Sequence, residues 1–212
     1  MATLLVDADI MVYKITSSTE EPTNWDGDLW TMHCDFAQAK KNISDTIDAL
    51  VDKVKVDSVI LCFSDKLNFR KDINLEYKLT RKKTRKPMCY VPALEFCKEN
   101  YKYEIKPKLE ADDVMGIMAS GDDEYIIYSE DKDLLTGDTT DGYNGCPTIG
   151  PKRAEAILEN LTPSEMWSAV VDTYKSRMFG ENYALLQARM ARILRDGEYI
   201  NNEPVLWSPH VN

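Results

Sequence analysis

Short runs of apolar residues recur along this chain, and one or more carboxylates follow each run within a few residues. The four runs are "TLLVDADI" (3–10), "SVILCFSD" (58–65), "YKYEIKP" (101–107) and "EYIIYSEDKDL" (124–134). Stretches with helical spacing of apolar residues lie between them, at 35–53, 91–100 and 110–120, and 16–33 reads as a loop or hairpin. Strands that alternate with helices predict a parallel α/β sheet.

Ligand sites in such sheets lie beyond the carboxyl ends of the strands, where the carboxylates of this chain gather. The candidates are Asp7, Asp9, Asp65, Glu110, Asp112, Asp113, Asp131, Asp133, Asp138 and Asp141. Three of them crowd into "LEADD" (109–113) and repel one another unless water or a cation separates them. An all-oxygen set suits Mg²⁺ or Mn²⁺, and its size favours two ions. Two ions about 4 Å apart can activate water and stabilise the leaving oxygen of a phosphodiester.

The net charge of −10 argues against a nucleic-acid partner only if the charge is spread evenly. Between Lys66 and Lys86, nine basic residues stand against two acidic ones, which gives +7 for this segment. We expect 66–89 to be a mobile basic loop or arch. A basic segment beside an acidic basin is typical of a metal-dependent enzyme that acts on a polyanion.

Several classes of protein are disfavoured. The five cysteines are scattered and odd in number, which predicts reduced thiols rather than a disulfide framework or a zinc site. Neither of the two histidines lies near an acidic cluster, so histidine-based catalysis is disfavoured. No leader pattern and no run of 18 apolar residues is present, so we expect a cytoplasmic protein without a membrane partner.

Two kinds of phosphate chemistry fit the first acidic strand. "LLVDADIMV" (4–12) is similar to the nucleophile strand of dehalogenase-type phosphatases, and "GDTTD" (137–141) resembles their late acidic motif. In that interpretation Asp7 is the nucleophile and Asp9 the acid/base.

The stretch "GYNGCPTIGPKRAEAILE" (142–159) favours a different partner, because it reads as a helix–hairpin–helix. Gly145 and Gly150 permit a tight turn, Pro147 helps to fix it, and Pro151 suits the first turn of a helix. Backbone N–H groups at such a helix start can hold a DNA phosphate without reading sequence.

The motifs and their order resemble the phage and bacterial 5′→3′ exonuclease and flap endonuclease family, in its phage replication branch, over nearly the whole chain. The resemblance implies a PIN-like fold: a parallel sheet with flanking helices, followed by a helical DNA-binding region. It places two Mg²⁺ ions, replaceable by Mn²⁺, on the carboxylates of "LLVDAD", "FSDKLNFRK", "LEADD", "SEDKDL" and "GDTTDGY". These ligands are Asp7, Asp65, Glu110, Asp112, Asp113, Asp131, Asp133, Asp138 and Asp141.

The same resemblance assigns the basic segment to the substrate. "EYKLTR" (76–81) matches the arch motif, which implies that Tyr77 stacks on DNA while Lys78 and Arg81 contact the scissile phosphate. The expected DNA-binding residues are Arg70, Lys82, Arg85, Gly145, Ile149, Gly150, Lys152 and Arg153. The implied substrates are duplex ends, nicks and 5′ flaps of DNA, with RNA–DNA hybrids and replication proteins as further partners. A K⁺ ion is implied at the hairpin, and the host cytoplasm as the location.

The expected organisation is a nuclease domain at 1–134 and a helix–hairpin–helix region at 135–212. Two departures from the family matter. Thr148 replaces a hairpin glycine, at a cost of about 1 kcal/mol or more if its φ is positive. The connection at 134–137 is several tens of residues shorter than the family's, which puts a sheet edge and the second metal site at risk. A non-catalytic, structure-selective DNA-binding protein is therefore the main alternative.

Overall fold

The structure is a computed structural model that describes residues 2–79, 84–121, 125–128 and 141–209. The chain forms two compact units whose segments interleave along the sequence. Unit 1 comprises 1–67, 85–130 and 194–203, and unit 2 comprises 68–84, 131–193 and 204–212. The predicted division near residue 134 therefore differs from these units at two segments. Part of the basic segment belongs to unit 2, and 194–203 returns to unit 1.

Unit 1 is built on a four-stranded sheet with the order β5-β4-β1-β6, and every pairing is parallel. The strands are β1 (Thr3–Asp7), β4 (Ser58–Phe63), β5 (Tyr103–Ile105) and β6 (Tyr125–Tyr128). Asp7 lies opposite Cys62 in the register of β1 and β4. The parallel α/β sheet predicted from the sequence is confirmed.

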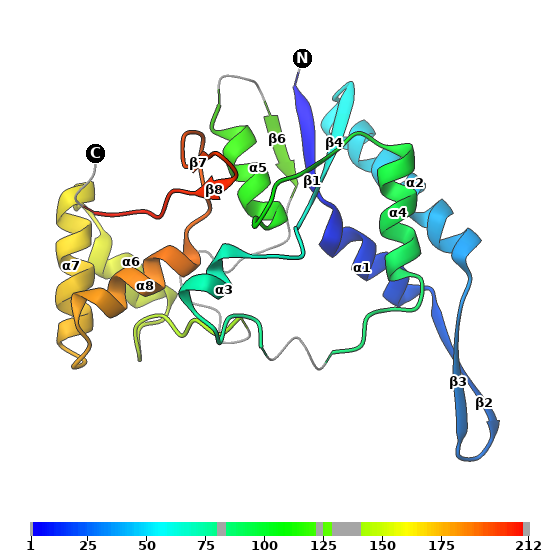
Figure 1. Cartoon of the computed structure of the whole chain (residues 1–212), viewed down its shortest axis with the longest axis horizontal. Helices are drawn as coiled ribbons and strands as arrows, with labels where there is room; N and C mark the ends of the chain where they lie inside the picture. The colour runs from blue at the N-terminus through cyan, green and yellow to red at the C-terminus, as the bar shows by residue number, and fades with distance from the viewer. Residues whose placement is uncertain (1, 80–83, 122–124, 129–140, 210–212) are drawn as a thin grey trace. The chain divides into compact units, whose positions relative to one another are not determined.

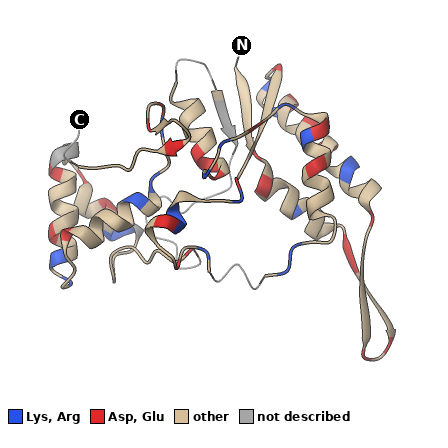
Figure 2. Cartoon of the chain, viewed as in Figure 1, with Lys and Arg blue, Asp and Glu red and all other residues tan. Residues whose placement is uncertain are grey.

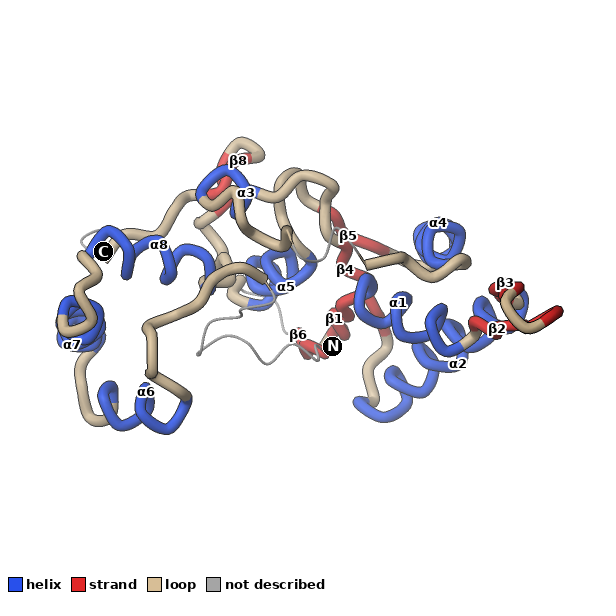
Figure 3. The backbone as a smooth tube through the Cα atoms, turned by 90° about the horizontal axis from the view of Figure 1, so that it is seen from below, coloured by secondary structure: helices blue, strands red, loops and turns tan. Residues whose placement is uncertain are grey.

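Helices cover both faces of this sheet (Figures 1 and 3). One face packs α1 (Ala8–Ser18), α2 (Phe36–Val54) and α4 (Tyr90–Asn100), and the other packs α5 (Ala111–Ala119). The core beneath the first three helices is apolar, with Leu4, Val6 and Leu61 fully buried against Ile43 and Val12. The central strands β1 and β4 carry buried apolar residues on both faces, because both faces are covered.

The polar stretch at 16–33 was predicted to be a loop or a hairpin. It contains most of an antiparallel hairpin of β2 (Glu20–Asp26) and β3 (Leu29–Cys34). The hairpin carries four acidic residues and no Lys or Arg (Figure 2). Cys34, at its end, forms a disulfide with Cys89, and their Cα atoms are 6.3 Å apart. The prediction of reduced thiols was wrong for this pair, because the fold brings together two cysteines separated by 55 positions.

Unit 2 contains α3 (Phe69–Ile73), α6 (Pro151–Leu158), α7 (Pro163–Lys175) and α8 (Glu181–Ala191). The prediction of a mobile loop over 66–89 was wrong for its first part, since α3 lies there and Phe69 is buried. Asn68 caps α3 by accepting the backbone N–H of Arg70 at 2.8 Å. A five-residue helix leaves little periodic signal in the sequence.

The region at 135–212, which was expected to be helical, also contains two short strands. A small hairpin joins β7 (Tyr199–Ile200) to β8 (Glu203–Pro204). Asn201 and Asn202 form its turn with φ of 53° and 63°, the type I′ pattern that asparagine tolerates. None of the helices in the described part of the chain is long and apolar enough to cross a membrane.

Candidate metal centre and nucleic-acid interface

The carboxylates of unit 1 lie at the ends of strands and the starts of helices, as predicted. Asp7 ends β1 and is the N-cap of α1, where its Oδ1 accepts the backbone N–H of Ile10 at 3.1 Å. Asp65 follows β4, and its oxygens accept the backbone N–H groups of Lys66 (2.7 Å) and Lys108 (2.8 Å). These backbone donors hold the two side chains at the carboxyl ends of neighbouring strands.

The third acidic group begins α5. Glu110 is the N-cap and Asp112 lies in the first turn, where the helix dipole favours negative charge. Glu110 and Asp113 form a capping box, which explains why the sequence starts a helix here. Both Glu110 and Asp112 are partly exposed at this end of the helix.

Asp7 experiences an electrostatic environment that disfavours its charge. It is 6% exposed, and burial followed by the negative charge of Asp112 raises its pKa to about 7. The negative charge of Asp9 also raises this pKa, while backbone hydrogen bonds from Ile10 and Asp9 lower it. A buried carboxylate whose pKa is raised by a neighbouring carboxylate is suited to a cation, whose charge would offset the repulsion.

Asp113 occupies a different environment from its neighbours. Its side chain is fully buried, with Oδ1 accepting the N–H of Leu194 at 3.2 Å and Oδ2 accepting the N–H of Glu110 at 3.3 Å. The contact with Leu194 joins α5 to the returning segment 194–203 of the same unit. Its assignment as a metal ligand stays a prediction, and its geometry fits a positioning role.

Three of the predicted ligands, Asp131, Asp133 and Asp138, lie outside the described residues. Across 2–79, 84–121, 125–128 and 141–209, no three His, Cys, Asp or Glu side chains converge into a complete metal site. The oxygen donors that unit 1 does present are those preferred by Mg²⁺ and Mn²⁺. The described carboxylates therefore fit part of a divalent site.

Unit 2 holds Asp141, and it pairs this carboxylate with a predicted catalytic residue. The Lys78 ammonium lies 3.5 Å from Asp141 Oδ2, and the Lys78 backbone N–H donates to the Asp141 carbonyl at 2.9 Å. Gly142 follows with φ of 80°, and a Cβ there would lie 2.6 Å from the Glu76 carbonyl oxygen. Only glycine permits this close approach of the two backbones.

Two other residues predicted to contact DNA are buried in unit 2. Tyr77 is 3% exposed and packs with Tyr143 and Met190. Arg70 is 4% exposed and donates to the carbonyls of Met190 (2.9 Å) and Arg192 (2.7 Å). Their assignments stay predictions, while the structure gives both side chains internal contacts.

Three further basic residues were predicted to contact DNA or its scissile phosphate. Arg81 and Lys82 lie outside the described residues. Arg85 belongs to unit 1, where its guanidinium forms a two-pronged ion pair with Glu20 at 2.8 and 2.6 Å. Its predicted contact with DNA is untested, and this ion pair gives it a structural partner instead.

The predicted hairpin turn has an irregular backbone that precedes α6. Gly145 and Thr148 adopt positive φ values of 61° and 66°, whereas Gly150 has φ of −96° and needs no special freedom. Gly150 is the N-cap and Pro151 the first residue of α6, as the sequence predicted. The positive φ of Thr148 therefore carries the conformational free-energy cost that the sequence predicted for a non-glycine residue here.

Both basic residues expected to contact DNA through α6, Lys152 and Arg153, are exposed in its first turn. One guanidinium N–H of Arg153 donates to the Thr148 carbonyl at 3.1 Å. This contact closes the turn onto the start of the helix.

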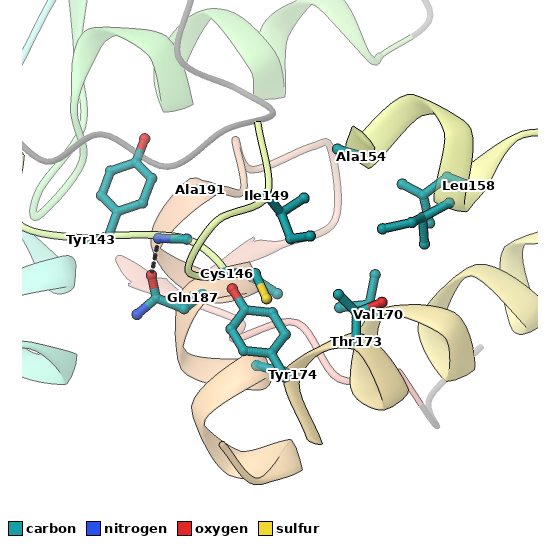
Figure 4. A pocket seen from close by; sticks show the side chains of 14 residues that line it. Tyr143, Cys146, Ile149, Ala154, Leu158, Val170, Thr173, Tyr174, Gln187 and Ala191 are labelled. Atoms are coloured by element: carbon teal, nitrogen blue, oxygen red, sulfur yellow. Dashed lines mark hydrogen bonds between the residues drawn. The ribbon is translucent and has the colours of Figure 1, made fainter. Parts of the chain in front are cut away.

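A cavity of about 180 Å³ lies behind this turn (Figure 4). Its lining is mostly apolar and comes from the turn and the three helices α6, α7 and α8, with Ile149 among the lining residues. Gln187 of α8 accepts the N–H of Gly145 at 2.9 Å at one side. No local pattern in the sequence points to Gln187, because its partner lies 42 positions away.

Comparison with known proteins agrees with these features. The family model described as "5'-3' exonuclease, N-terminal resolvase-like domain" matches residues 2–141. An exodeoxyribonuclease of Enterobacteria phage T3 is 28% identical, covering 97% of this chain and 92% of that protein. An exonuclease of Escherichia phage T7 is 27% identical, covering 97% and 93%.

The alignment with the phage T3 protein also bears on the predicted internal shortening. It spans 280 positions, while 97% of 212 residues is about 206, so about 74 positions have no residue in this chain. The chain is thus shorter than this relative within the aligned region, in agreement with the short connection noted in the sequence.

Solved structures share the fold at low sequence identity. The phage T5 protein co-crystallised with metal ions has a TM-score of 0.63 at 13% identity, covering 90% of this chain and 89% of that one. A phage T5 flap endonuclease complex with DNA and metal ions has a TM-score of 0.60 at 14% identity, with the same coverage. The PIN-like fold class is confirmed.

The match over 2–141 and the two phage relatives favour the exonuclease interpretation over the dehalogenase-type phosphatase. The order of acidic motifs, the sheet that carries them and these similarities agree. The chain belongs to the 5′-3′ exonuclease family, and the 5′→3′ nuclease predicted from its motifs is confirmed.

Proposed function

We propose that this exonuclease depends on divalent metal and hydrolyses DNA phosphodiesters at 5′ ends, nicks and flaps. The observation that carries the metal requirement is Asp7, whose pKa is raised to about 7 by burial and by Asp112. A buried carboxylate beside another carboxylate is stabilised in its charged form by a cation. The similar phage T5 structures, one with metal ions and one with DNA and metal ions, support the same proposal.

The residues of unit 1 proposed to hold Mg²⁺ are Asp7, Asp65, Glu110, Asp112 and Asp113. The family resemblance adds Asp131, Asp133, Asp138 and Asp141 to the proposed ligands. Bound Mg²⁺ would supply Lewis acidity toward the phosphate and lower the pKa of water. Asp7 and Asp65 would contribute oxygens whose directions are already fixed by backbone N–H groups. The count of two ions remains part of the proposal.

The substrate would be held by cationic and backbone groups of unit 2. Lys78 supplies a charge beside Asp141 that can neutralise a phosphate oxygen. The exposed Lys152 and Arg153, in the first turn of α6, can bind the DNA backbone without reading sequence. Such contacts make the affinity for DNA fall as salt rises.

Other partners predicted from the sequence remain expectations. The family resemblance is the basis for expecting RNA–DNA hybrids and replication proteins as partners. It is also the basis for expecting a location in the host cytoplasm. A K⁺ ion at the hairpin would lie in the turn whose Thr148 carbonyl accepts a hydrogen bond from Arg153.

Cleavage of a labelled 5′ flap and a nicked duplex tests the proposal, with Mg²⁺ and then with EDTA. We expect cleavage only with Mg²⁺ and a loss of at least about a hundredfold in Asp112→Asn, as befits a ligand. Glu95→Gln is the matched control, since Glu95 is an exposed residue of α4 that pairs with Lys98, and its substitution should leave cleavage unchanged.

A second candidate is the non-catalytic DNA-binding protein, and the internal shortening favours it. It predicts that the chain binds the flap substrate but does not cleave it in either Mg²⁺ or Mn²⁺. Such a result would refute the metal-dependent hydrolysis proposed above.

A further inference from the structure

Asp9 lies in the first turn of α1 and contacts the end of a neighbouring strand. Its Oδ2 accepts the backbone N–H of Ser64, which directly follows β4, at 2.7 Å. Its Oδ1 accepts the hydroxyl of Tyr90, the first residue of α4, at 3.4 Å. One carboxylate therefore ties together the starts of two helices and the end of a strand.

Ser64 extends this link to a third site-bearing segment. Its Oγ accepts the backbone N–H of Ala111, the first residue of α5, at 3.1 Å. The hydrogen-bonded series Asp9–Ser64–Ala111, which we call the Asp9 bridge, lies wholly within unit 1. All of its members are described. Asp9 was one of the candidate carboxylates in the sequence, but the ligand set implied by the family resemblance does not include it.

Each member of the Asp9 bridge stands next to a proposed ligand in the sequence. Asp9 is two residues from Asp7, Ser64 precedes Asp65, and Ala111 follows Glu110. The Asp9 bridge thus fixes the spacing of the three backbone segments that carry Asp7, Asp65 and Glu110. Hydrogen bonds of this kind orient the ligands of metal sites and raise their affinity.

We infer that Asp9 is a positioning residue that holds these three backbone segments in place before the divalent ion binds. The inference rests on the proposed function, because it takes Asp7, Asp65 and Glu110 as ligands. Asp9 acts through backbone and hydroxyl donors, and both of its oxygens accept such hydrogen bonds. Preorganisation of this kind reduces the reorganisation that binding would otherwise require.

The alternative role for Asp9 is purely structural, as a brace between α1, α4 and β4. A brace would change the thermal stability of the protein without changing its affinity for metal. A third role, direct ligation of the ion, would require the carboxylate charge itself. Two substitutions separate these roles, since Asn keeps an oxygen that can accept the Ser64 N–H and Ala does not.

The test measures the Kd for Mn²⁺ by calorimetry without DNA in the wild-type protein, Asp9→Ala and Asp9→Asn. The control is Asp35→Ala, because Asp35 is a helix N-cap of the same unit that accepts the Gln38 N–H at 3.0 Å. We expect Asp9→Ala to weaken Mn²⁺ binding about tenfold or more, and Asp9→Asn to restore it to within about threefold. The control should bind Mn²⁺ as the wild type does.

A parallel assay measures the Mg²⁺ concentration for half-maximal flap cleavage, which should rise in Asp9→Ala while the KM for DNA is unchanged. Wild-type Kd in Asp9→Ala, with only a lower Tm, would assign the structural role and overturn the inference. Equal losses in Asp9→Ala and Asp9→Asn would make Asp9 a ligand and overturn it as well. Wild-type protein that binds no Mn²⁺ and cleaves nothing would refute the proposed function itself.

Discussion

Neutralising Asp7 should stabilise the metal-free protein, although it removes a proposed ligand. Asp7 is 6% exposed, and burial with the nearby charge of Asp112 raises its pKa to about 7. Asp7→Asn removes the ionisation but keeps an oxygen that can accept the Ile10 N–H at the helix N-cap. The substitution therefore changes the charge while leaving the local hydrogen bond in place.

The magnitude follows from the difference between the folded and unfolded pKa values. A carboxyl whose folded pKa is raised from 3.8 to about 7 stabilises the fold fully below pH 3.8. That contribution is lost as pH rises through the folded value, and it amounts to about 4 kcal/mol by pH 8. Asp7→Asn avoids the loss, so we expect its metal-free Tm at pH 8 to exceed the wild-type Tm by roughly 5–15 °C.

The assay is thermal unfolding in EDTA between pH 5 and pH 8, repeated at pH 8 with Mg²⁺. The gain from Asp7→Asn should shrink steadily toward pH 5. Mg²⁺ should raise the Tm of the wild type and have little effect on the variant. Asp35→Asn is the matched control at the N-cap of α2, and its Tm should follow the wild type. An Asp7→Asn gain that is absent at pH 8, or equal at all pH values, would refute the reasoning.

Four further substitutions test two backbone conformations and the ion pair that holds Arg85. Thr148→Gly should raise the free energy of unfolding by about 1 kcal/mol in urea titrations, because Thr148 has φ of 66°; no gain would show that this conformation carries no strain. Gly142→Ala should lower it by more than about 2 kcal/mol, since a Cβ would lie 2.6 Å from the Glu76 carbonyl oxygen; wild-type stability would contradict that close approach. Glu20→Arg should make the segment around Arg85 more sensitive to limited proteolysis, because the paired charges become repulsive. Combining it with Arg85→Glu should restore protection, and a double variant as sensitive as the single one would refute the ion pair.

The sheet and the placement of its carboxylates could be predicted because they depend on local patterns. Apolar runs of three to five residues define β1, β4 and β6, and the capping box of Glu110 and Asp113 marks the start of α5. Parallel strands then bring their acidic ends to one edge of the sheet.

The features that the sequence did not predict depend on partners far along the chain. Arg70 was expected to bind DNA, whereas in the structure its guanidinium donates to carbonyls about 120 positions away. Cys34 and Cys89 gave no spacing signal, and the Gln187 contact with the hairpin turn joins α8 to a distant loop. Tertiary contacts decided these cases, and composition and periodicity report only local preference.

Crystals grown with Mn²⁺ and measured near its absorption edge would locate the ion directly by anomalous scattering. The account predicts a peak coordinated by Asp7 and Asp112, with Asp9 hydrogen-bonded to Ser64 and outside the coordination sphere. A peak elsewhere on the chain, or none at Mn²⁺ concentrations that support cleavage, would contradict the central claim that these strand ends hold the catalytic metal.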